Sequence, residues 1–377
     1  MNPTELFSFN LLGLAVLVHL VFVNITIGTG WISAMARFLG WRRNDPSLEI
    51  MGRRVFKILI VHELFSGVWG TIITVILAGF FPTLLAIATD IMFWPLLIAL
   101  TAIIIRIPSI ALFWYTWGKI KPSTHSALGF VMALSGFAVP MGFRYIFTEI
   151  TYPHAVGMAL QGMQDIARLQ VFFNPLYPPL ILHTWTAAMS VGGFVTAAFF
   201  AIKGNESAKF MWIGLWHGVL FLAAQPFFGL WYLLALGEKA PILYNNILGT
   251  AAATYNVLPL FAGKMAVVTA LAVVSAVVWR QVKRGAGTAT RMALALGPLA
   301  ALTVILGEYI NDGGRAPYLV LLGDKGLPVS TFLNVYIEIP FTLVFAVLGL
   351  LVVFIGGFMA TVYYGLNKRF LVDLPEV

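Results

Sequence analysis

Long apolar runs separated by short polar stretches fill the chain from end to end. Each run is close to the roughly 20 residues that a helix needs to cross about 30 Å of hydrocarbon at about 1.5 Å per residue. The pattern therefore predicts about nine transmembrane helices. We expect them near residues 9–35, 56–80, 92–117, 126–148, 178–203, 210–236, 257–281, 289–309 and 333–364.

The polar connections between these runs are short. The longer ones cover residues 145–177 and 237–256, where Pro, Gly and Asn interrupt the apolar pattern. No polar segment exceeds about thirty residues, which is too few for an independent soluble domain. Residues 1–377 are therefore predicted to form a single all-α integral membrane domain.

Basic residues are concentrated on one alternating set of these connections. That set holds sixteen Lys and Arg residues, whereas the opposite set holds only Arg144, Arg168, Lys239, Arg315 and Lys325. Cytoplasmic loops are enriched in Lys and Arg, so we expect the N-terminus outside and the C-terminus in the cytoplasm of a prokaryotic cell. The same enrichment accounts for the net charge of +8, which gives no reason to expect a nucleic-acid partner.

Composition excludes a soluble protein and several redox centres. Hydrophobic residues make up 60% of the chain and charged residues 10%, whereas soluble domains carry about 25% charged residues. Cysteine is absent, which excludes disulfides, thiolate-held iron–sulfur clusters and covalent haem attachment. The first apolar run is too long for a signal peptide and is expected to remain in the membrane, in contact with lipid.

Several potential ligands fall in the predicted outer half of the membrane. His19 lies about ten residues into the first helix, His183 about one and a half turns into the fifth, and Met265 about two turns into the seventh. Ionisable groups inside a membrane are costly and are usually functional. Each His has two interpretations at this point, a haem ligand or a polar residue that hydrogen-bonds to a neighbouring helix.

Small residues follow both outer histidines. Thr186, Ser190 and Gly192 follow His183, and Thr26 and Gly28 follow His19. They leave room for a flat macrocycle, although small residues also serve plain helix packing. Met265 opposite an imidazole would give a low-spin haem of raised potential, whereas a lone imidazole or carboxylate would leave an open position for a gas.

The eighth predicted helix ends in the polar segment EYINDGGRAPY, which covers residues 308–318. One interpretation is an interfacial loop. The other is a haem-binding segment, in which Glu308 or Asp312 is a metal ligand and Arg315 pairs with haem propionates through bidentate hydrogen bonds.

Taken together, these segments resemble subunit I of cytochrome bd oxidase over most of the chain. The opening SFNLLGLAVLVHLVFVNITIGTG is similar to that family's first helix, and NPLYPPLILHTW to its fifth. PLFAGKMAVV is similar to its methionine-bearing segment, and GGRAPY to its Gly-Arg-Gln-Pro-Trp motif. The resemblance implies a low-spin haem b held by His183 and Met265. It also implies high-spin haem at His19 and at Asp312 or Glu308, with two or more haems b and haem d as a further type.

Three departures from the family pattern affect its chemistry. The family carries two glutamates on the third helix, where this chain has Ala99 and Ile107 beside Arg106. The family's carboxylate haem ligand corresponds to Asp312, with Glu308 one turn earlier. Its long quinol-binding loop is reduced here to about twenty residues that include Glu238 and Lys239.

Two functions follow from these observations. The first is the haem-bearing subunit of a bd-type quinol:oxygen oxidoreductase, assembled with a second membrane subunit. The alternative is a non-catalytic b-type cytochrome that relays electrons between the quinone pool and a c-type cytochrome. The missing glutamates favour the relay because oxygen reduction consumes protons, whereas His19 and GGRAPY favour a second haem site.

Two further histidines, His62 and His217, are predicted near the inner ends of their helices. One interpretation is a pair of interhelical hydrogen bonders, with Glu63 and Arg106 forming an ion pair nearby. The other is an inner-side proton entry or a bis-histidine haem.

Overall fold

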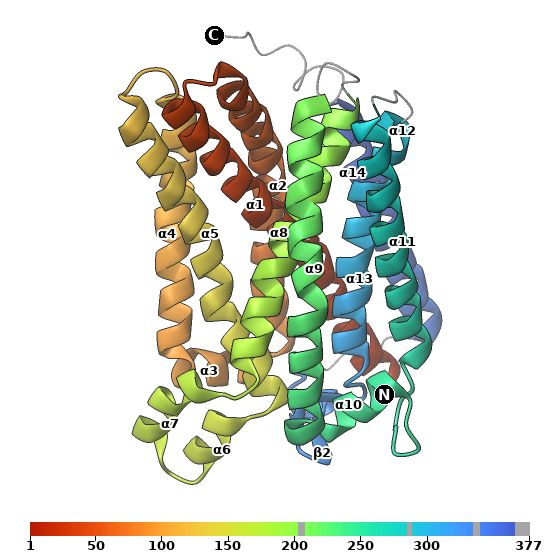
Figure 1. Cartoon of the computed structure of the whole chain (residues 1–377). Coiled ribbons are helices and arrows are strands. Elements are labelled where there is room, and N and C mark those ends of the chain that lie inside the picture. The colour runs from red at the N-terminus through yellow and green to blue at the C-terminus, as the bar shows by residue number, and fades with distance from the viewer. Residues whose placement is uncertain (203–207, 285–288, 335–339, 366–377) are drawn as a thin grey trace.

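The computed structural model describes residues 1–202, 208–284, 289–334 and 340–365, and they form a bundle of long helices (Figure 1). The long helices are α1 (Pro3–Arg43), α2 (Pro46–Phe80), α4 (Phe93–Tyr115), α5 (Pro122–Thr151), α8 (Tyr177–Ile202), α9 (Ala208–Lys239), α11 (Leu258–Lys283), α13 (Leu296–Gly313) and α14 (Phe341–Gly365). Each overlaps one of the nine predicted runs, with ends that differ by up to about ten residues, and residues 335–339 of the ninth run lie outside the described residues. Within the described residues, eight stretches are long and apolar enough to span a membrane, and α14 occupies the ninth run. The all-α membrane fold is confirmed.

The first two helices begin earlier than their apolar patterns predicted. Asn2 caps α1 in a reciprocal arrangement, because its Oδ1 accepts from the Glu5 amide at 2.9 Å and its own amide donates to the Glu5 carboxylate at 3.0 Å. Asp45 caps α2 by accepting from the Ser47 amide. A hydrogen bond from Lys209 lowers the pKa of Asp45 to about 2, so this cap stays ionised at neutral pH. Polar first turns carry no apolar periodicity, which is why the prediction began too late.

Short elements gather at one end of the bundle, which we call the outer end in line with the charge prediction. They are α3 (Pro82–Ile91), α6 (His154–Leu160), α7 (Gln164–Gln170), η1 (Val171–Phe173), α10 (Pro241–Leu248), and a hairpin of β1 (Tyr318–Leu322) and β2 (Lys325–Pro328), followed by η3 (Val329–Thr331). In Figure 1 the labels α6, α7, α10 and β2 lie together at this end, and α12 (Ala289–Ala293) lies at the opposite one. The expected connections 145–177 and 237–256 are thus largely helical, which is a correction.

Glycine contacts bring α1, α8 and α9 close together. A Cβ on Gly28 of α1 would lie 2.7 Å from Gly192 Cα on α8, and a Cβ on Gly193 would lie 2.6 Å from Gly218 Cα on α9. No side chain fits between backbones at such distances. Gly28 and Gly192 therefore pack helices against each other, and the expectation that they make room for a macrocycle is wrong.

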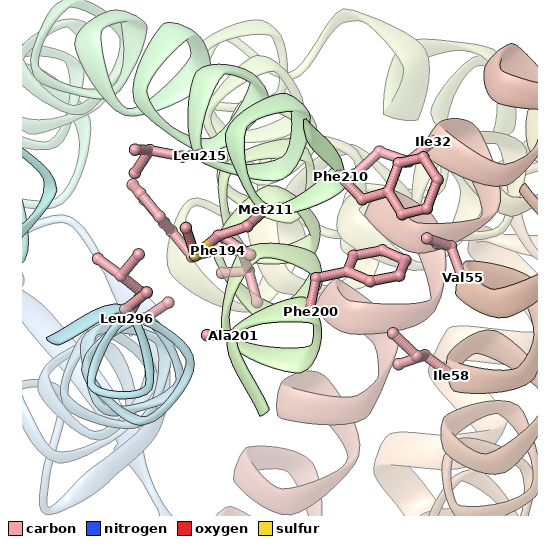
Figure 2. Packing of buried hydrophobic residues seen from close by; sticks show 14 of the residues in the cluster. Ile32, Val55, Ile58, Phe194, Phe200, Ala201, Phe210, Met211, Leu215 and Leu296 are labelled. Carbon is pink, nitrogen blue, oxygen red and sulfur yellow. The ribbon is translucent and has the colours of Figure 1, made fainter. Parts of the chain in front are cut away.

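A dry core fills the inner half of the bundle between these helices. Phe194, Phe200, Phe210, Met211 and Leu296 pack there with residues of α1 and α2, as Figure 2 shows. Because lipid tails are as apolar as these side chains, the core stabilises the fold through close van der Waals packing between the helices. This core packs the inner parts of the helices together, whereas His19, His183, Glu308, Asp312 and Arg315 lie towards the outer end.

Candidate haem-binding site

One ring nitrogen of His19 makes a hydrogen bond, and the other is free to bind a ligand. Its Nδ1 lies 2.9 Å from the Ser66 carbonyl oxygen on α2. A carbonyl oxygen can only accept, so Nδ1 carries the proton and Nε2 presents its lone pair. Metal-binding histidines are held in this way by a second hydrogen bond that fixes the tautomer. Gly70 lies one turn beyond Ser66, and a Cβ there would be 3.2 Å from His19 Cε1. The imidazole therefore depends on Gly70 for its position.

His183 is placed on α8 against a glycine of α9. A Cβ on Gly229 would lie 3.3 Å from His183 Cε1. Gln225, one turn earlier on α9, donates to the His183 carbonyl oxygen at 3.0 Å and so ties the two helices together at this level. His183 Nδ1 is buried and has no hydrogen-bond partner in the described part of the chain. Burying a polar group without a hydrogen bond costs roughly 1–3 kcal/mol of folding free energy. A ligand that bonds to the ring would remove this cost.

Lys264, rather than Met265, is the residue of α11 that lies near this polar region. Met265 is 44% exposed. Lys264 Nζ lies 2.9 Å from the point where a Cβ on Gly307 of α13 would sit, and its charge interacts with Glu308 and with His183. Sequence reasoning passed over Lys264, although a lysine within an apolar run is itself a signal. Ligation by Met265 stays a prediction.

Both candidate carboxylates lie near the outer end of α13. Glu308 Oε1 accepts from Arg144 Nη2 of α5 at 3.0 Å. Its second oxygen, Oε2, is buried without a partner among the described residues. Asp312 follows one turn later and interacts electrostatically with Arg315, Glu308 and Arg144. The choice between the two carboxylates as a ligand stays open, but only Glu308 shows a buried oxygen without a partner.

Arg315 is buried in full, with 1% of its surface exposed. Its Nε donates to the Asn311 carbonyl oxygen and its Nη2 to Thr151 Oγ1, both at 3.2 Å. Nη1 has no partner among the residues that the structure covers. An arginine cannot lose its charge, and neither of its two partners is an anion. The guanidinium is thus available to an anionic group bound at this end of the bundle.

These groups fit an iron porphyrin better than a bare metal ion. Within the described ranges, no cluster of three or more His, Asp or Glu side chains is arranged to hold a metal ion. A porphyrin supplies four nitrogens of its own, so the protein needs to add only one or two axial ligands. Single imidazoles at His19 and His183, a free carboxylate oxygen and a buried guanidinium meet that requirement. The arrangement agrees with haem and its propionates.

The structure shows the surroundings of the three α4 residues that depart from the family pattern, Ala99, Arg106 and Ile107. Arg106 Nε and Nη2 donate to the two Glu63 oxygens of α2, each at 2.7 Å, and Nη1 donates to the Met132 carbonyl oxygen at 3.1 Å. The predicted ion pair is confirmed. Ala99 is fully buried, and Ile107 is 62% exposed on the outside of the bundle.

Breaking this pair should destabilise the protein. Glu63→Gln leaves Arg106 buried without a counter-ion, which we expect to lower the free energy of unfolding by about 3 kcal/mol. The double variant Glu63→Gln/Arg106→Met removes both charges and should recover most of that loss. Thermal unfolding in detergent, followed by circular dichroism, measures both.

Asp90→Asn is the matched control for this test. It breaks the ion pair between Asp90 and Arg168, which is exposed although its 2.6 Å distance is as short. Exposed pairs contribute about 1 kcal/mol or less, so this variant should unfold close to wild type. A Glu63→Gln protein as stable as the control would contradict a structural role for the Glu63–Arg106 pair.

The two inner histidines differ from each other. His62 Nδ1 lies 2.7 Å from the Ile58 carbonyl oxygen of its own helix, and its ring packs near Phe22. His217 packs on Phe221, and its Nε2 is buried without a partner in the part of the chain that the structure describes. The contact of His62 Nδ1 is thus within its own helix, and the interhelical role of both histidines stays a prediction.

Comparison with known proteins identifies the family. Residues 10–245, more than half of the chain, match the family model described as cytochrome bd terminal oxidase subunit I. No curated protein sequence matches significantly. A chain of the bd oxidase from Geobacillus thermodenitrificans has the same fold, with a TM-score of 0.75 at 18% identity over 98% of this chain and 100% of that one. The matched residues carry both outer histidines, and the protein is a member of the cytochrome bd oxidase subunit I family, a haem-bearing subunit of the prokaryotic respiratory membrane.

Proposed function

We propose that this subunit carries two or more haems near the outer end of the bundle, and that one of them binds oxygen. The observation that supports this proposal most strongly is the state of His19. Its Nδ1 is held by the Ser66 carbonyl oxygen at 2.9 Å, so the lone pair of Nε2 is free and would hold the haem iron. Haem held by one imidazole supplies an open coordination position for a gas, together with electron transfer.

His183 is assigned to the low-spin haem b. The support is its buried, unpartnered Nδ1 and the close approach of Gly229. Met265 remains the proposed second ligand, and the positive charge of Lys264 beside His183 favours the reduced, less positive state of a bound iron. The packing of α8 against α9 at His183 would keep water away from the haem held there.

Glu308 and Asp312 are proposed as alternative ligands of a high-spin haem, of type b or d. Glu308 is supported by its free Oε2 and by Arg144, which keeps the other oxygen in place. Arg315 is assigned to the propionates, since its buried Nη1 has no partner in the described structure. A bound propionate would complete the hydrogen bonding of the guanidinium.

Membership of this family implies a membrane complex with a second subunit and a quinol. The proposed electron donor is a quinol of the bilayer. A c-type cytochrome is the alternative donor. The shortness of the outer connection between α9 and α11, which contains the eight-residue helix α10, supports this alternative. The replacement of two family glutamates by Ala99 and Ile107 supports slow oxygen turnover, because neither side chain has an ionisable group that could transfer a proton.

Carbon monoxide binding tests this proposal on the purified complex. We expect the reduced protein to bind CO stoichiometrically, because a haem with one axial ligand has an open position. Oxygen consumption with a quinol donor should be slow. A reduced protein that leaves CO unbound has only six-coordinate haems and is the electron relay. Fast oxygen consumption would contradict the expected loss of the proton route.

A further inference from the structure

Glu149 is a buried carboxylate outside the candidate haem-binding residues. It lies on the last turn of α5, at the outer end of the bundle, and only 1% of its surface is exposed. A buried carboxylate is costly unless hydrogen bonds satisfy its oxygens. Three N–H groups do so for Glu149, and in the described part of the chain all three belong to neutral groups.

One oxygen of Glu149 holds the segment that follows α5. Its Oε2 accepts from the backbone amides of Ala155 at 3.0 Å and Val156 at 3.4 Å. Both amides lie in the first turn of α6, where N–H groups have no acceptor within their own helix. Glu149 therefore fixes the corner between α5 and α6.

The other oxygen of Glu149 holds the start of α8. Its Oε1 accepts from Asn174 Nδ2 at 2.9 Å. The same amide group donates to the Tyr152 carbonyl oxygen at 2.9 Å, and Asn174 Oδ1 accepts from the Leu176 amide at 3.0 Å, just before α8 begins. His183 lies about two turns further along the chain. Through Asn174, Glu149 thus fixes the helix of His183 to the end of α5.

The same turn of α5 also holds Arg315. Thr151 is two residues beyond Glu149, and its Oγ1 accepts from Arg315 Nη2 at 3.2 Å. Thr151 Oγ1 in turn donates to the Phe147 carbonyl oxygen at 2.7 Å, so its position follows that of the helix. The last turn of α5 is therefore the common support of α8 and of the buried guanidinium.

We propose that Glu149 is a positioning residue for the haem that His183 holds, because it keeps the start of α8 and the Arg315 guanidinium at a fixed separation. A macrocycle is rigid, so its axial ligand and the partner of its propionates must be in register before it binds. His19 lies on α1 and is held by α2, outside this network. The inference rests on the proposed roles of His183 and Arg315.

Glu149→Gln tests the proposal on the purified complex in detergent. The variant has nearly the same shape, but its amide nitrogen cannot accept a hydrogen bond. We expect the haem of His183 to pass to excess apomyoglobin roughly fivefold to tenfold faster, the equivalent of one hydrogen bond. CO binding at His19 should equal that of wild type. Hydrogen exchange should accelerate in peptides that cover residues 152–180.

Asn174→Ala provides a second route to the same result. It removes the connection to α8 but leaves the bonds between Glu149 and α6. Haem transfer should accelerate by a similar factor. Adding Glu149→Gln to Asn174→Ala should then have little further effect, because groups in one network are not additive. Fully additive effects would contradict the proposal that Glu149 acts through Asn174.

Ser33→Ala is the matched control. It removes another buried hydrogen bond between segments, from Ser33 Oγ of α1 to the Gly52 carbonyl oxygen of α2 at 2.8 Å. It should lower the thermal stability while the rate of haem transfer stays that of wild type.

Equal rates of haem transfer in Glu149→Gln and Ser33→Ala would overturn the inference, because Glu149 would then contribute to stability alone. Loss of CO binding together with the low-spin haem in Glu149→Gln would also overturn it, since the effect would be a general loss of the fold. Wild-type protein that contains no haem would overturn the proposed function and this inference with it. The haem content of the wild type, measured first, therefore separates the two failures.

Discussion

His183→Ala should produce a protein that still inserts into the membrane but has lost the low-spin haem b and its sharp bands in the reduced spectrum. The reason is chemical, because alanine offers no ligand atom and the haem is not covalently attached. His183 lies between Gly229 of α9 and the charge of Lys264. Roughly one haem per chain should disappear. Reduced-minus-oxidised spectra and a haem assay on purified protein measure this.

A second variant distinguishes ligation from a general effect on folding. Gly229→Val keeps the imidazole but places a side chain where even a Cβ would be 3.3 Å from His183 Cε1. We expect a shifted or weakened low-spin spectrum. Gly263→Val is the control, because no atom lies within 4 Å of a Cβ there. An unchanged spectrum in His183→Ala would remove His183 from the haem site. Met265→Leu should keep the haem and lower its potential, because a thioether ligand favours the reduced state.

His19→Ala should abolish CO binding while the low-spin spectrum stays intact, since the two histidines lie on different helices, α1 and α8. The Ser66 carbonyl oxygen, 2.9 Å from His19 Nδ1, would be left without this partner. CO difference spectra of the reduced protein measure the effect. CO binding of wild-type amplitude in His19→Ala would show that the gas binds elsewhere.

Gly70 and Gly67 provide a matched pair for this site on one helix. A Cβ on Gly70 would be 3.2 Å from His19 Cε1, whereas nothing lies within 4 Å of a Cβ on Gly67. Gly70→Val should therefore reduce CO binding, and Gly67→Val should not. Glu308→Ala and Asp312→Ala then identify the carboxylate ligand. The true ligand loses a high-spin haem, and the other variant alters only its potential.

The positions of the long helices could be predicted from the sequence. Apolar runs of membrane-spanning length leave little alternative to a helix, whereas the outer position of His19 and His183 depends on the charge pattern and stays a prediction. The predicted partnership of Glu63 and Arg106 is also confirmed, because an unpaired charge is rarely tolerated inside a bundle.

Contacts between distant segments could not be read from the sequence. The positions of Gly70 and Gly229 beside the imidazoles depend on how the helices rotate about their axes, and glycine is common in membrane helices. Rotation also decides that Lys264 lies near Glu308 while Met265 is exposed. The short helices α6, α7 and α10 were missed because each has only seven or eight residues.

Counting haems in wild type and in the His19→Ala/His183→Ala double variant tests the central claim most directly. A pyridine haemochrome assay on purified protein gives both the number and the type of haem per chain. We predict two or more haems in wild type, with haem b present, and a loss of roughly two in the double variant, because each imidazole holds one iron. Equal haem content in the two proteins would contradict the assignment of His19 and His183 as the haem ligands.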